Sequence, residues 1–81
     1  MDLDRTRAAY KQIAAEMIKR IRSGAYGTDA KLPSVVELAN EFGVVNSTAA
    51  RAMTLVREAG LTRAEPGLGT YVLPPGEWPN P

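Results

Sequence analysis

Apolar residues recur at helical spacing in the first third of the chain. From Tyr10 to Arg22 they return every three or four positions, while charged and small residues fill the opposite face. This pattern predicts an amphipathic helix over 10–22. Ser23-Gly24 follows as a stop signal, and the turn-rich stretch after it predicts a loop that Tyr26 anchors to the core. The inward-facing stripe of the helix consists of Tyr10, Ile13, Ala14, Met17, Ile18 and Ile21.

A second, shorter helix is predicted directly after Leu32-Pro33. Ser34 and Glu37 have the spacing of a capping box, in which the serine caps the helix start and the glutamate reaches back. Gly43 suits the left-handed conformation that commonly ends a helix. The helix between them has only eight or nine residues. Its inward positions are Val35, Leu38, Ala39 and Phe42.

A third helical pattern runs from about Asn46 to Ala59 and stops at Gly60. After this glycine the period changes, and residues 61–63 and 70–73 are two short strand candidates joined by a glycine-containing loop over 64–69. The fold class is therefore mainly α with a small β-hairpin. The shared core beneath the helices and the hairpin is predicted to contain Leu38, Phe42, Met53, Val56 and Leu61.

The last eight residues contain four prolines, which predicts a linker or a loose tail over 74–81. Trp78 lies within this segment. It could fill a groove on a partner protein, but a lone tryptophan near a terminus more commonly folds back on its own domain.

Length and composition exclude most catalytic chemistry. A chain of 81 residues can form one compact core, and it has no cysteine and no histidine. Thiol nucleophiles, disulfides, the usual zinc ligands and imidazole acid–base catalysis are therefore absent. We find no nucleophile–base pair and no phosphate-binding loop, so we expect no enzymatic activity, no cofactor and no metal. The charged N-terminus resembles neither a signal peptide nor a membrane span, which predicts a cytoplasmic protein without membrane partners.

The charge distribution is unusual for a protein that binds nucleic acid. The formal net charge is only +1, and six of the ten basic residues lie before residue 23. Two interpretations of these six residues are open: contacts to a DNA backbone, or the solvated face of the first helix. The second interpretation is favoured. The residues concerned are Arg5, Arg7, Lys11, Lys19, Arg20 and Arg22.

The order of the predicted elements suggests a use for them. A helix, a short turn and a helix, followed by a hairpin, is the order of a winged helix-turn-helix. The second helix of such a pair fits the major groove of B-DNA, and the hairpin can lie along adjacent phosphates or the minor groove. Small helical domains with a terminal hairpin also serve as protein-binding modules, so the order alone leaves both functions open.

Several short segments make the prediction more specific. The residues of these segments, and their spacing over residues 10–73, resemble the DNA-binding domain of the GntR family of bacterial transcription regulators. The segments that carry the resemblance are Tyr10-Lys11-Gln12-Ile13, Lys31-Leu32-Pro33-Ser34, Glu37-Leu38-Ala39, Phe42-Gly43-Val44, Gly60-Leu61 and Pro66-Gly67-Leu68-Gly69-Thr70-Tyr71-Val72.

The resemblance implies an architecture and a function. It implies a winged helix-turn-helix with three helices and a two- to three-stranded wing, which binds operator DNA as a dimer and regulates transcription. It divides the chain into an N-terminal arm (1–9), a DNA-binding domain (10–73) and a proline-rich tail or linker (74–81). The family's separate domain that senses a small metabolite has no counterpart here, so we expect no small-molecule site in this chain. Either the chain is part of a longer regulator or the regulator is naturally short.

The sequence departs from the family at positions that usually carry arginine. These positions hold Val36 in the second helix, and Asn46 and Ala50 in the third. The wing has an acid and a leucine where positive charge is usual, and only Arg63 remains there. The carry-over of DNA contacts is therefore partial.

The remaining candidates for DNA contact are short polar residues and a few cations. Hydroxyl and amide side chains can bond both phosphates and base edges, and the start of a helix offers unpaired N–H groups to a phosphate. An alternative for Asn46 is that it merely caps the third helix, because Val45 before it cannot. The candidate residues are Lys31, Ser34, Asn46, Ser47, Thr48, Arg51, Arg63 and Gly67. The expected partners are double-stranded DNA and, weakly or only on DNA, a second copy of the chain.

A different use of the same fold stays open from the sequence. A winged helix that has lost its basic residues could be a protein-interaction module with small apolar residues on its surface. The residues that favour this alternative are Val36, Val45, Ala49, Ala50 and Leu68.

Overall fold

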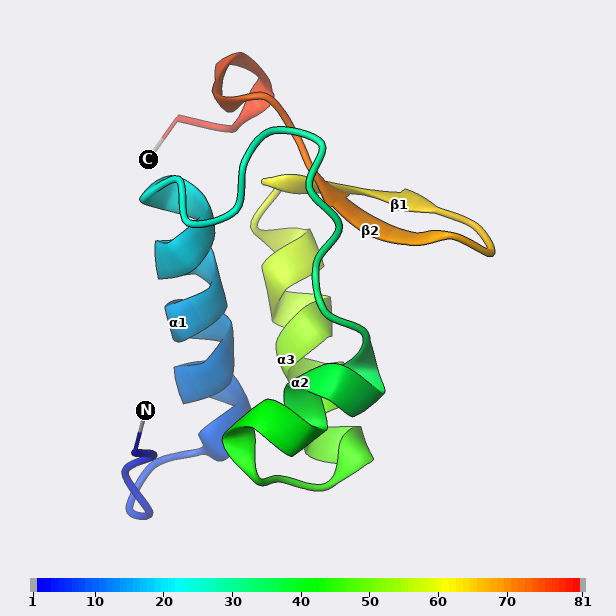
Figure 1. Ribbon diagram of the computed structural model, residues 1–81. Coiled ribbons are helices and arrows are strands. Elements are labelled where there is room, and N and C mark those ends of the chain that lie inside the picture. The colour runs from blue at the N-terminus through cyan, green and yellow to red at the C-terminus, as the bar shows by residue number, and fades with distance from the viewer. Residues whose placement is uncertain (1, 81) are drawn as a thin grey trace.

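The computed structural model describes residues 2–80 and contains three helices followed by a hairpin (Figure 1). This confirms the predicted fold class. None of the helices in this range combines the length and the apolar character needed to cross a membrane. The elements are α1 (Ala9–Arg22), α2 (Val35–Phe42), α3 (Asn46–Glu58), β1 (Thr62–Glu65), β2 (Gly69–Val72) and a short 3-10 helix, η1 (Pro75–Glu77). The helix boundaries lie within one residue of those predicted.

The ends of α2 are fixed as its sequence predicts. The Ser34 hydroxyl accepts a hydrogen bond from the Glu37 backbone N–H at 3.1 Å, and the Ser34 backbone N–H donates to Glu37 Oε1 at 2.9 Å. The second of these bonds lowers the pKa of the Glu37 carboxyl from its ordinary value. At the other end Gly43 is left-handed, with φ 65°. The turn from α2 into α3 is therefore short and closely defined.

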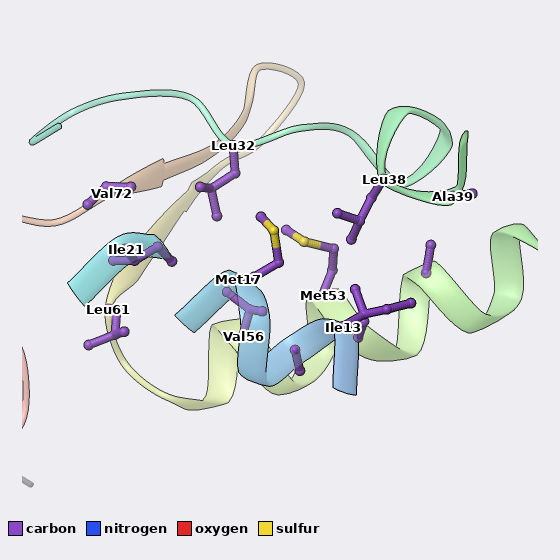
Figure 2. Packing of buried hydrophobic residues seen from close by; sticks show 13 residues of the cluster. Ile13, Met17, Ile21, Leu32, Leu38, Ala39, Met53, Val56, Leu61 and Val72 are labelled. Carbon is purple, nitrogen blue, oxygen red and sulfur yellow. The ribbon is translucent and has the colours of Figure 1, made fainter. Parts of the chain in front are cut away.

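The core lies where the three helices meet. α1 and α3 run beside each other and α2 crosses them near one end (Figure 1). Figure 2 shows the side chains of Met17 and Met53 directed into one space, with Leu38 beside them. The larger buried side chains include Ile13, Met17, Ile21, Leu32, Leu38, Met53, Val56, Leu61 and Val72. Four of the five predicted core residues are thus confirmed as buried.

Phe42, the fifth predicted core residue, is only half-buried. As the last residue of α2 it packs at the edge of the core, where it lines a pocket together with residues of the N-terminal segment and its ring faces Arg20. The Arg20 guanidinium carbon is 5.4 Å from the ring centre. The same guanidinium also pairs with Glu41 of α2 at 2.7 Å, which joins α1 to α2. Tyr10, predicted as core, is likewise half-buried, and Tyr26 packs against the core with its hydroxyl 3.8 Å from the Met17 sulfur.

The hairpin is longer than predicted because its turn needs only three residues. β1 and β2 pair in antiparallel register, with Thr62 opposite Val72 and Glu65 opposite Gly69. The Leu68 N–H closes the turn by donating to the Glu65 carbonyl at 2.9 Å. Gly67, the third residue of this four-residue β-turn (65–68), has the positive φ of 76° that a type II turn requires at that position. The wing has two strands. The third is reduced to one bridge, between Lys31 and Tyr71.

The described part of the C-terminal segment does not form the loose tail expected from its prolines. Residues 75–77 form η1, and the Trp78 indole N–H donates to the Leu73 carbonyl at 2.8 Å. Trp78 is half-buried against the core, which confirms the prediction that it folds back. Gly60 approaches the Pro79 ring so closely that a Cβ at Gly60 would lie 3.1 Å from Pro79 Cγ. These contacts hold the segment against the domain.

Candidate nucleic-acid interface

The outer face of α3 is the surface opposite the core. Ala49, Ala52, Met53 and Val56 point inward, while Asn46, Ala50 and Thr54 follow one another at four-residue intervals on the exposed side. The Thr54 hydroxyl donates back to the Ala50 carbonyl at 3.1 Å. This face therefore presents an amide and small groups, and no charge in its first turn.

Asn46 does not cap α3, so this alternative is wrong. The N-cap position is held by Val45, and no side chain accepts a hydrogen bond there. Asn46 is the first residue of the helix proper. Its exposed amide forms no hydrogen bond within residues 2–80, and neither do the side chains of exposed Ser47 and half-buried Thr48. The polar groups at the start of α3 are thus free to bind a ligand.

Two of the arginines named by the sequence are held by other side chains. The Arg63 guanidinium in β1 pairs with Asp29 at 3.1 Å and Glu65 at 2.8 Å, and it lies over the Tyr71 ring. Arg51 lies over Tyr10 of α1, with its guanidinium carbon 3.9 Å from the ring centre. The two carboxylates offset the charge of Arg63, whereas the neutral Tyr10 ring restrains the position of Arg51 without removing its charge.

Lys31, Ser34 and the wing meet in a cleft beside α3. The cleft has a volume of about 250 Å³ and is lined by residues of the segment ahead of α2, of α3 and of the wing. Gly67, at the tip of the wing turn, is exposed and outside this lining. The start of α3, with Asn46, is also outside it. Of the predicted site residues, Lys31 and Ser34 line the cleft, and Asn46, Ser47 and Thr48 lie at the start of α3. Gly67 lies at the tip of the wing, and Arg51 and Arg63 are held by other side chains.

Sequence reasoning missed Arg57, which lies in the same cleft. It is exposed on α3, eleven residues after Asn46. Eleven residues are about three helical turns, so the two side chains share one side of α3. Helical spacing measured from Asn46 could have identified it.

Three large apolar side chains are exposed near these groups. The exposed fractions are 55% for Val36, 67% for Val45 and 64% for Leu68. Ala49, which the interaction-module alternative also placed on the surface, is fully buried, because it points from the first turn of α3 into the core. The apolar surface is therefore smaller than that alternative needs.

The chain has a helix-turn-helix followed by an antiparallel hairpin, and the polar side chains at the start of its second helix form no hydrogen bonds within the residues that the structure describes. This combination defines a winged helix-turn-helix DNA-binding domain. The chain belongs to the family described as "Bacterial regulatory proteins, gntR family", whose sequence pattern matches residues 9–72.

Curated relatives support this assignment. The chain is 30% identical over 66 residues to the uncharacterized HTH-type transcriptional regulator YieP of Escherichia coli, covering 82% of this chain and 29% of that protein. It is 28% identical over 72 residues to the HTH-type transcriptional regulator Rv1152 of Mycobacterium tuberculosis, covering 89% of this chain and 60% of that protein. The chain thus spans less than two thirds of the length of either relative.

Solved structures share the fold. A GntR family transcriptional regulator from Listeria monocytogenes superposes with a TM-score of 0.81 at 32% identity, covering 88% of this chain and 62% of that one. The DNA-binding domain of AraR, solved in complex with operator ORE1, superposes with a TM-score of 0.71 at 33% identity. That match covers 78% of this chain and 77% of the AraR chain.

Proposed function

We propose that this domain binds duplex DNA with sequence preference, with α3 in the major groove and the wing on the adjacent minor groove. The observation that carries the proposal is the start of α3, where Asn46 and Ser47 are exposed and have no structural hydrogen bond. Base edges in the major groove are read by side chains placed in this way on a recognition helix. The AraR domain, which was solved with its operator, supports the same use of the fold.

Each predicted residue has a distinct role in this proposal. Asn46 reads the N6 and N7 edge of an adenine, a pairing that its amide matches. Ser47 and Thr48 bond a phosphate or a base edge beside it. The Ser34 hydroxyl, which caps α2 by accepting from the Glu37 backbone N–H, contacts a phosphate, and Lys31 supplies a charge. At Gly67 the backbone of the wing turn can approach the duplex closely.

Arg51 and Arg63 contribute less than their charge suggests. Either side chain reaches DNA only by leaving the contacts that hold it, namely the Tyr10 ring for Arg51 and two carboxylates for Arg63. The proposal therefore places most of the selectivity on neutral polar groups and gives the phosphates few partners.

The test is a binding measurement with the 81-residue chain against a library of genomic duplex fragments, at a series of salt concentrations. With roughly three to five phosphate contacts at about −0.9 each, the slope of log K against log salt should be shallow, about −3 to −4.5. Absence of binding to any fragment at low salt would contradict the proposal and favour a protein-interaction module.

We further propose that the domain acts on DNA in the cytoplasm and associates with a second copy only weakly or on DNA. Within residues 2–80 the only large exposed apolar side chains are Val36, Val45 and Leu68. Three scattered residues offer little area for a stable dimer, which usually buries about 800 Å² per partner. Sedimentation velocity with and without a palindromic duplex distinguishes a DNA-induced dimer from one that forms in solution.

A further inference from the structure

The cleft between α3 and the wing is lined by two basic residues and by no acidic residue. Lys31 enters it from the segment ahead of α2 and Arg57 from α3, and Gly69 and Thr70 of β2 form the opposite wall. Neither basic side chain has a carboxylate partner in the described part of the chain, whereas Arg7, Arg20 and Arg63 are all paired. Glu37 of α2 lies near enough for the Lys31 charge to contribute to its lowered pKa, but the two form no direct ion pair. Within the described residues, the cleft therefore keeps positive charge that no direct ion pair offsets.

Arg57 is oriented within the cleft by the wing. Its Nη2 atom donates to the hydroxyl of Thr70 at 3.2 Å, and Thr70 is itself 5% exposed. A guanidinium has five N–H donors in a rigid fork. One bond to a buried hydroxyl therefore fixes the group in place and leaves the other donors for an anion.

Lys31 is placed by the absence of a side chain at Gly69. A Cβ at this position would lie 2.7 Å from Lys31 Cε, and Gly69 has a φ of 136° that other residues rarely adopt. The lysine stem consequently lies across β2. The bridge between Lys31 and Tyr71 holds its backbone at the same strand. Both cations are thus positioned by contacts with β2.

The ligand follows from the way a winged helix meets DNA. The sugar–phosphate backbone of one DNA strand separates a major groove from the adjacent minor groove. When α3 occupies the major groove and the wing occupies the minor groove, this backbone has to pass between α3 and the wing. We infer that Lys31 and Arg57 together bind a backbone phosphate of this strand in the cleft. The inference rests on the proposed function and adds to it a phosphate site that spans the recognition helix and the wing.

The first experiment measures the charge that each residue neutralises. Fluorescence anisotropy follows binding of the 81-residue chain to the best duplex from the genomic library, between 50 and 200 mM salt. Removing one phosphate contact should make the slope of log K shallower by about 0.9, so that affinity falls about 3.5-fold less over this range. Because both cations bind the same phosphate, we expect this full change in the double variant Arg57→Gln with Lys31→Ala, and a smaller change in each single variant. Lys19→Ala, an exposed lysine on α1, is the matched control and should keep the wild-type slope.

The second experiment locates the phosphate. Duplexes that carry a single neutral methylphosphonate linkage are scanned along both strands with the wild-type chain and with Arg57→Gln. At one linkage between the two grooves, the wild-type chain should lose affinity and the variant should lose less, because only Lys31 still binds that phosphate. Equal losses in both proteins at every linkage, or a wild-type slope in Arg57→Gln, would overturn this inference while DNA binding itself remained. If the wild-type chain bound no duplex, the proposed function would fail instead.

Discussion

The guanidinium carbon of Arg51 lies 3.9 Å from the centre of the Tyr10 ring, so a cation of α3 is stacked on an aromatic side chain of α1. Because this contact joins two helices, Arg51→Ala and Tyr10→Leu should not act additively on stability. We expect a coupling energy of about 0.5–1 kcal/mol, typical of an exposed cation–π pair. A double-mutant cycle of urea unfolding measures it. A coupling energy near zero would mean that Arg51 is available to DNA after all.

Asn46 should determine base preference and contribute little to stability. Since Val45 and not Asn46 occupies the N-cap of α3, Asn46→Ser and Asn46→Ala should both melt close to the wild-type temperature. Either variant should lose about 1–3 kcal/mol of discrimination at one base pair, because the bidentate contact to adenine is removed. Thermal melts together with selection from a randomised duplex pool test both points. An unchanged selected sequence would transfer recognition to Ser47, Thr48 or the wing.

Neutralising the acids around Arg63 should strengthen DNA binding. In Glu65→Gln combined with Asp29→Asn, the guanidinium loses both of its ionic partners and the wing loses two negative charges. If Arg63 then gains one phosphate, the salt slope should become steeper by about 0.9. Binding titrations at several salt concentrations show this. Glu77→Gln in η1 is the control for a general charge effect, and an unchanged slope in the double variant would count against a wing contact by Arg63.

The core predicts an order of mutational cost that differs from the sequence expectation. Leu38 is fully buried and Phe42 only half-buried, so Leu38→Ala should destabilise the domain more than Phe42→Ala. A buried leucine costs about 2–5 kcal/mol when truncated to alanine, which is a large fraction of the stability of a small domain. Urea unfolding at neutral pH ranks the stabilities of the two variants. A larger loss of stability in Phe42→Ala would mean that the side of α2 that carries Phe42, and not the side that carries Leu38, faces the core.

Glu37 should make the domain less stable in acid. Its pKa is below the ordinary value of 4.5 in the folded protein, chiefly because the Ser34 backbone N–H donates to it. A carboxyl with a lowered pKa contributes fully above its unfolded pKa, and the contribution is lost as pH falls through the folded pKa. The difference in urea midpoint between wild type and Glu37→Gln should thus shrink between neutral pH and about pH 3.

Local signals in the sequence predicted most of the fold. The capping box of Ser34 and Glu37, the left-handed Gly43 and the apolar periodicity each act over a few residues, and all three are confirmed. The sequence failed where the outcome depends on tertiary contacts rather than on local composition. The proline-rich end is ordered because Trp78 reaches the Leu73 carbonyl and Pro79 meets Gly60, contacts that composition does not encode.

The sequence predicted which residues are candidates for DNA contact, but it did not predict which of the cations are paired with other side chains. Sequence counts Arg63 and Arg51 as cations, but whether a cation is free depends on long-range neighbours. Asp29 is 34 positions from Arg63, and Tyr10 belongs to another helix from Arg51. Conversely, Arg57 belongs to no local motif; helical spacing places it on the side of α3 that carries Asn46, but the bond to Thr70 that holds it in the cleft is visible only in the structure.

The bond between Arg57 and Thr70, with the bridge between Lys31 and Tyr71, also restricts how the wing can move. Because two adjacent residues of β2 are held in this way, the base of the hairpin resists swinging to follow the duplex, and the spacing between α3 and the wing changes little. The DNA duplex therefore has to deform to fit the protein, and the deformation costs less free energy where the duplex bends easily. We expect preferred sites to contain pliable pyrimidine–purine steps such as TA or CA near the wing, even at base pairs that no side chain touches.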